Sequence, residues 1–159
     1  MKTKDYKQGA QKKRAFTSVF EQLRQAGLRP TRQRMALGRL LFEQGVRHVT
    51  ADSLYREALD SGVGVSLATV YNALRQFTEA GLLKEVIVDN SGVYFDTNLS
   101  PHYHYFLEDE GILVDVEWGH ESLKIGEVFS GGQNVPSGMK VSRVDVMVRL
   151  TASPVEDAE

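Results

Sequence analysis

The sequence predicts an α+β fold, in which an N-terminal winged helix-turn-helix domain is followed by a small α/β dimerisation domain. Up to about residue 80, apolar residues recur at spacings of three and four, and strand-like alternation then replaces this period. A glycine turn separates the last two helical segments and a hairpin signal follows them, an order typical of winged helices. We place the domains at residues 1–95, of which 1–14 form a basic arm, and at residues 96–159.

Two helices open the folded part of the first domain. The first is expected at residues 15–25, because its apolar residues form one stripe, and it should end at Gly27. The second follows Pro30, takes Thr31 as its N-cap and is closed by Gly45.

The next two helices flank a turn that contains Gly62 and Gly64. The third should begin at Thr50 and bury its apolar residues Leu54, Ala58 and Leu59. The fourth should be capped by Ser66. One of its faces is apolar, with Leu67, Val70, Tyr71, Leu74 and Phe77, and the opposite face is polar, with Thr69, Asn72, Arg75 and Gln76.

Strands are expected after the fourth helix. A hairpin turns at residues 89–92, and the stretches "HYHYFLE" and "ILVDVE" flank a second turn. A short helix is expected near residues 120–128, and a last strand at 140–150. The second domain has only about 60 residues, and as a monomer it would expose the edges of its sheet to solvent, so we expect a homodimer.

Composition narrows the class of protein. The chain has 159 residues and no cysteine, which excludes disulfides and thiolate zinc sites. No apolar run reaches the roughly 20 residues of a membrane span, and the N-terminus lacks the apolar centre of a signal peptide. We therefore expect a cytoplasmic protein without membrane partners.

Charge is divided unevenly along the chain. Residues 1–84 carry 15 Lys and Arg against 7 Asp and Glu, whereas residues 85–159 carry 4 against 14. Surplus basic residues are often only a solvated surface, but here they continue into chain with helical patterning. The basic half therefore favours a nucleic acid as its partner.

The polar face of the fourth helix suits contact with DNA. Asn and Gln side chains can bind adenine through two hydrogen bonds, and Arg can bind guanine in the same way. The alternative is that these residues are merely the solvent side of an amphipathic helix. The basic sequence before the helix, the tight turn and the hairpin together favour DNA.

The second domain contains two histidines separated by one residue, which are candidate metal ligands. On a strand, His102 and His104 would share one face, while Tyr103 and Tyr105 occupy the other. Such a pair is often only hydrogen-bonded within a sheet. Carboxylates at Asp96, Asp115 and Glu117, and a histidine at position 48, instead favour a site for iron, manganese or zinc.

Three stretches resemble the ferric uptake regulator family: "LRPTRQR" at 28–34, "SLATVYNALRQFTEAGLL" at 66–83 and "YFDTN" at 94–98. The resemblance covers roughly residues 20–150 and is closest to the iron response regulator branch. It implies an iron-responsive transcriptional regulator, a homodimer whose fourth helix enters the major groove of AT-rich double-stranded operators. Tyr71 matches a tyrosine that touches thymine, and Arg29 matches a basic residue that enters the minor groove. Asn72 stands where an arginine is usual, which changes the expected operator. The full set expected at DNA is Arg29, Thr31, Arg34, Ser66, Thr69, Tyr71, Asn72 and Arg75.

The resemblance also implies a sensory metal site between the domains, at His48, Asp96, His102, His104 and Asp115. The family's cysteine-pair zinc site is absent, because Leu107 and Glu110 occupy its positions, and no zinc site with four cysteines is expected. In the iron response branch a histidine cluster here binds haem, so haem through His102 or His104 is a second expectation, with the haem-synthesis machinery as a possible partner. A ligand joining the domains would then set the separation of the two recognition helices and so control DNA affinity.

Other classes of function are less well supported. No cysteine nucleophile, phosphate-binding glycine loop or Ser/His/Asp arrangement indicates an enzyme, although a metal hydrolase is conceivable. A DNA-binding repressor with purely structural histidines would bind its operator equally with and without a chelator. A metal-buffering protein would leave the basic N-terminal half unexplained.

Overall fold

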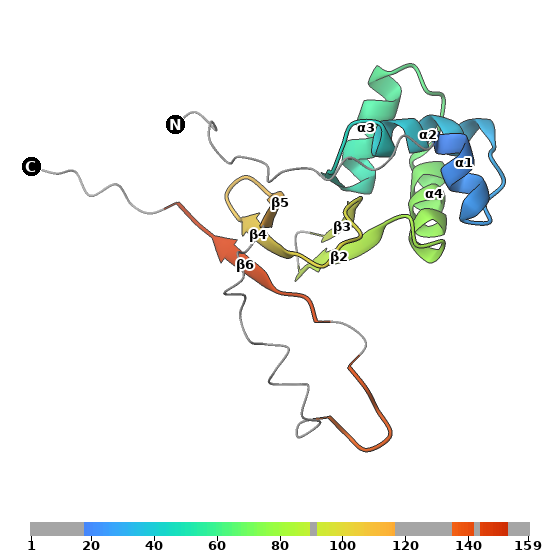
Figure 1. Cartoon of the computed structure of the whole chain (residues 1–159). Coiled ribbons are helices and arrows are strands. Elements are labelled where there is room, and N and C mark those ends of the chain that lie inside the picture. Colours follow the sequence, from blue (N-terminus) through green and yellow to red (C-terminus); the bar gives the residue numbers. More distant parts are fainter. Residues whose placement is uncertain (1–17, 90–91, 117–134, 142–143, 153–159) are drawn as a thin grey trace, which may run out of the picture. The chain divides into compact units, whose positions relative to one another are not determined.

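A computed structural model describes residues 18–89, 92–116, 135–141 and 144–152 of the chain (Figure 1). The chain divides into two compact units, Met1–Ser100 and Pro101–Glu159. Within the described residues, the first unit holds helices α1 to α4 and strands β1 to β3, and the second holds strands β4 to β6. Among the described residues, no helix is long and apolar enough to cross a membrane.

The four helices of the first unit each begin at a serine or threonine. They are α1 (Val19–Gln25), α2 (Arg32–Phe42), α3 (Ala51–Asp60) and α4 (Leu67–Glu79). The side chains of Ser18, Thr31, Thr50 and Ser66 each accept a hydrogen bond from the backbone N–H three residues later. These bonds satisfy N–H groups that have no partner within the helix. The expected starts of the last three helices are confirmed, whereas the expected start of the first lies outside the described residues.

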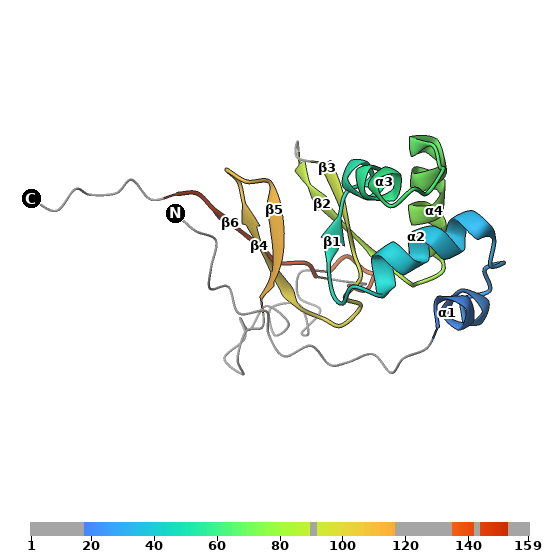
Figure 2. The same cartoon turned by 90° about the horizontal axis from the view of Figure 1, so that it is seen from above.

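The first unit also contains a small antiparallel sheet, ordered β1-β3-β2. Its strands are β1 (His48–Val49), β2 (Lys84–Val88) and β3 (Gly92–Asp96). The hairpin of β2 and β3 forms the expected wing after α4. Figures 1 and 2 show the helices gathered on one side of this sheet. The register pairs His48 with Asp96, and Val49 with Phe95.

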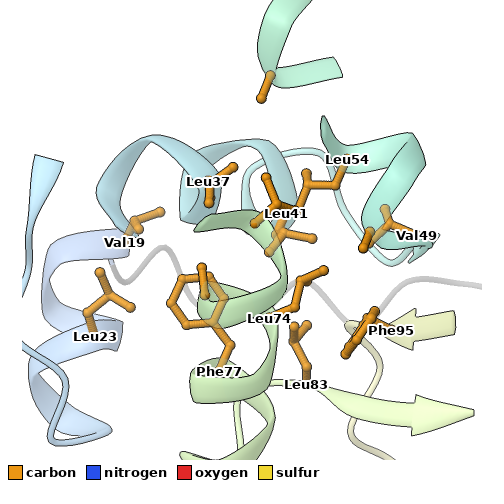
Figure 3. Packing of buried hydrophobic residues seen from close by; sticks show 14 residues of the cluster. Val19, Leu23, Leu37, Leu41, Val49, Leu54, Leu74, Phe77, Leu83 and Phe95 are labelled. Atoms are coloured by element: carbon orange, nitrogen blue, oxygen red, sulfur yellow. The ribbon is translucent and has the colours of Figure 1, made fainter. Parts of the chain in front are cut away.

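The core of the first unit lies where the helices meet the sheet (Figure 3). Leucines from α1 to α4, Phe77 from α4 and Phe95 from β3 are almost completely buried in it. The expectation that Leu59 is buried was wrong, because its side chain is 49% exposed. Leu54 and Ala58 share the inward face of α3, and Leu59 is turned by about 100° from Ala58.

The second unit contains a three-stranded sheet, ordered β5-β4-β6. β4 (Tyr103–Leu107) pairs antiparallel with β5 (Ile112–Val116) and parallel with β6 (Met147–Leu150). His104 and Phe106 are buried while Tyr103 and Tyr105 are half-buried, which confirms the expected alternation. The last strand covers only the end of the predicted range 140–150. The helix expected near residues 120–128 lies outside the described residues.

Candidate functional site

Three donor side chains converge on one face of the second sheet. The Nε2 atoms of His102 and His104 lie 2.9 Å apart. Oδ1 of Asp115 lies 3.1 Å from Nε2 of His102 and 3.8 Å from Nε2 of His104. The sheet creates this arrangement, because Asp115 on β5 is the register partner of His104 on β4. One turn between the two strands thus brings a carboxylate to the histidine pair.

The environment of this triad suits a metal ion. Both imidazoles have side chains only 7% exposed, and that of Asp115 is 22% exposed. Donor atoms about 2.0–2.2 Å from one ion lie roughly 3 Å or a little more from each other, which matches these separations. Imidazole nitrogen and carboxylate oxygen, without thiolate, suit iron, manganese or zinc.

A second donor pair lies in the first unit. Nε2 of His48 on β1 lies 3.6 Å from Oδ1 of Asp96 on β3, and the two residues are register partners. The side chain of Asp96 is completely buried, and that of His48 is 8% exposed. The backbone N–H of Asn98 donates to Oδ1 of Asp96 at 2.6 Å. Burying a carboxylate costs free energy unless charge or hydrogen bonds compensate it, so this position is typical of a functional group.

The five residues expected at the metal site therefore fall into two groups, each brought together by a strand pairing. Three aromatic residues next to the histidines, which could also contact a haem, differ in burial. Phe106 is 1% exposed and belongs to the sheet interior, and Arg149 lies over its ring. Tyr103 and Tyr105 are half-buried on the opposite side of β4 from His104.

The polar side of α4 is open to a ligand. Tyr71 is 51% exposed at the edge of the apolar face, and Asn72 and Arg75 are exposed beside it. Arg75 makes a long ion pair with Glu79, at 3.9 Å between two exposed side chains. Ser66 and Thr69 are bonded to each other at the start of the helix, at 2.9 Å between their hydroxyl oxygens.

Arg34 makes contacts that its sequence pattern did not reveal. Its Nε and Nη2 both donate to Oε1 of Gln76 on α4, at 2.9 and 2.7 Å. Its Nη1 donates to the carbonyl oxygen of Arg29, at 2.9 Å. Arg29 is an exposed residue, as is the Thr31 cap between these two arginines.

Sequence reasoning did not identify Arg47, which precedes β1, the strand that carries His48. Its guanidinium binds Glu57 of α3 through two hydrogen bonds, at 3.0 and 2.7 Å. The bond from Arg47 holds the pKa of Glu57 below its usual value of 4.5. No local motif marks this pair, because its members are ten residues apart and only Glu57 lies on a helix.

Comparison with known proteins gives a consistent result. The model of the family described as "Ferric uptake regulator family" matches residues 25–124. The peroxide-responsive repressor PerR of Staphylococcus aureus (strain Mu50) is 41% identical over 96 residues. That match covers 60% of this chain and 64% of the repressor, so the chain spans less than two thirds of this relative. PerR of S. aureus strain USA300 matches to the same extent.

Solved structures share the fold. The ferric uptake regulator of Pseudomonas aeruginosa, determined with manganese, matches with a TM-score of 0.68 and 24% identity, over 87% of this chain and 100% of that one. The Helicobacter pylori ferric uptake regulator matches with a TM-score of 0.68 and 18% identity, over 89% and 94%. These likenesses confirm the predicted fold class. The sequence relatives carry names of peroxide-responsive repressors, so the iron response branch stays a prediction.

Proposed function

Since the chain belongs to the ferric uptake regulator family, we propose that it is a cytoplasmic, metal-responsive transcriptional regulator that binds operator DNA as a homodimer. Members of this family are transcriptional regulators and not enzymes. The observation that carries the metal part is the convergence of two imidazoles and a carboxylate in the second unit. The exposed polar side of α4, behind a basic N-terminal sequence, supports the DNA part.

His102, His104 and Asp115 would hold the ion together with His48 and Asp96 of the first unit. Three imidazoles and two carboxylates make a donor set suited to iron(II) or manganese(II). An ion bound by residues of both units would fix the DNA-binding unit against the dimer core. Because a dimer binds two half-sites only at matching separation, metal occupancy would then control DNA affinity.

A bare ion fits the residues better than haem. The Nε2 atoms of His102 and His104 lie against each other and near Asp115, with both side chains 7% exposed. A porphyrin would need these rings to separate and turn outwards, whereas a single ion takes the position between the donor atoms. We therefore rank manganese or iron above haem as the ligand.

At DNA, α4 would enter the major groove of an AT-rich operator. Tyr71, Asn72 and Arg75 are the exposed side chains with suitable chemistry. Ser66, Thr69 and Thr31 lie at helix starts, where hydroxyls and N–H groups bind phosphates. Arg29 would bind in the minor groove, and Arg34 would hold Arg29 in place through the hydrogen bond to its carbonyl oxygen.

The test is manganese(II) titration by calorimetry, with operator binding measured in parallel by fluorescence anisotropy at fixed salt. His102→Ala/His104→Ala should weaken manganese binding by well over tenfold, because it removes two donors. Tyr105→Phe, on the other side of the same strand, is the matched control and should bind manganese like the wild type. DNA affinity that stays the same with manganese and with a chelator would instead support a constitutive repressor.

A response to peroxide is a second candidate, favoured by the names of the sequence relatives. Iron(II) is readily oxidised by peroxide, and manganese(II) much less so. Peroxide should then change DNA affinity when the protein is supplied with iron(II) but not with manganese(II). Equal behaviour with both ions would exclude this candidate and leave metal sensing in place.

A further inference from the structure

Arg47 lies immediately before β1 and binds the strand that carries the second donor of the first unit. Its backbone N–H donates to Oγ1 of Thr97 at 2.9 Å, and its carbonyl oxygen accepts from the backbone N–H of Thr97 at 3.1 Å. Thr97 is 3% exposed and directly follows Asp96. The pair of Arg47 and Thr97 therefore continues the ladder next to the pair of His48 and Asp96.

The side chain of Arg47 reaches in the other direction, to two helices. Nη1 donates to the carbonyl oxygen of Leu40 in α2 at 2.8 Å, and the guanidinium binds both carboxylate oxygens of Glu57 in α3. Gln44 joins the same cluster, bonded to Arg47 and to Glu57 at 3.0 and 2.9 Å. A two-point bond between guanidinium and carboxylate fixes direction as well as distance.

The donor pair is thus held from both ends of a very short strand. On one side, Val49 and Phe95 are 2% and 5% exposed and belong to the core. On the other side, Thr97 is hydrogen-bonded to Arg47, and the Arg47 side chain is bonded to α2 and α3. β1 has only two residues, so its ladder alone restrains the His48 ring weakly.

We propose that Arg47, through Glu57 and the carbonyl of Leu40, is a positioning residue for the metal donors His48 and Asp96. This inference rests on the proposed function, in which that pair contributes to a metal site. Replacing residues that orient metal ligands typically weakens metal binding by about 10- to 100-fold. Arg47 acts through the backbone and not by a bond to either donor, so we expect the lower end, about tenfold.

The test compares manganese(II) affinity by calorimetry for the full chain and for Arg47→Lys and Glu57→Gln. Lysine keeps the charge but cannot bind both carboxylate oxygens, and glutamine keeps an acceptor but loses the charge. Both variants should bind manganese about tenfold more weakly, and amide hydrogen exchange around residues 47–50 and 95–97 should be faster in the metal-free protein. Arg56→Lys, an exposed neighbour of Glu57 on α3, is the matched control and should change neither.

Val19→Ala separates positioning from general loss of stability, because it weakens the core of the same unit away from the donors. It should unfold more easily yet keep wild-type manganese affinity. Unchanged manganese affinity in both Arg47→Lys and Glu57→Gln, or an equal loss in Val19→Ala, overturns the inference while the proposed function stands. If the wild type itself binds no manganese(II) or iron(II), the proposed function fails, and the inference fails with it.

Discussion

The bonds of Arg34 lead to a prediction that distinguishes a DNA-contacting arginine from one that holds the DNA-binding unit together. The guanidinium joins the start of α2 to Gln76 in the last turn of α4, and to the carbonyl of Arg29 just before α2. It therefore links three parts of the surface expected at DNA. If these bonds are structural, removing either Arg34 or Gln76 should destabilise the protein.

The magnitude follows from the number and setting of these bonds. Hydrogen bonds to charged groups contribute about 1.5–3 kcal/mol each when buried, and less when water competes. Arg34 and Gln76 are both half-buried, and their two bonds share one acceptor oxygen. We expect the free energy of unfolding to fall by about 2 kcal/mol in Arg34→Ala and by about 1 kcal/mol in Gln76→Ala. Their coupling energy should be about 1 kcal/mol, since each single change already removes the shared bonds.

The assay is urea unfolding followed by circular dichroism, for both single variants and the double variant at one protein concentration. A fixed concentration is needed because dimerisation adds to apparent stability. Arg39→Ala, an exposed arginine on the same helix, should change stability by less than about 0.5 kcal/mol. Single-variant losses that add within about 0.3 kcal/mol would refute the coupling.

Three further predictions concern stability. A methyl group at position 38 would lie 2.6 Å from Cγ1 of Val19, so Gly38→Ala should lose roughly 1 kcal/mol in urea unfolding despite alanine's better helix propensity, and Val19→Ala should relieve that loss. A gain in stability from Gly38→Ala would contradict this close packing of α1 on α2. The hydrogen bond from Arg47 lowers the pKa of Glu57 below 4.5, so the stability that the ionised Glu57 contributes is present above pH 4.5 and is lost as the pH falls through the lowered pKa. In urea unfolding at several pH values, Glu57→Gln should flatten the dependence of stability on pH below 4.5. Burial raises the pKa of Tyr94 above 10.0, so stability should fall as the pH rises past 10.0, and less so in Tyr94→Phe.

Local signals in the sequence were sufficient for the elements of the first unit. Thr31, Thr50 and Ser66 cap the helices that they were expected to cap, because a hydroxyl three residues before a backbone N–H needs only local geometry. The wing hairpin and the alternation along β4 were predicted for the same reason, since strand period and turn residues are local. The ambiguous position was Leu59, where one residue of helix rotation separates core from solvent.

The sequence by itself determined which donor types are present, that His102 and His104 share a face, and that no thiolate competes with them. Only the tertiary structure decided that Asp115 meets His104 across a strand pair and that Asp96 lies opposite His48. It alone also joined Arg34 to Gln76 and Arg47 to Glu57. Such contacts depend on strand register and on how whole elements pack. Register and packing produce no periodic pattern in the sequence of the contacting residues, so the sequence alone did not predict these contacts.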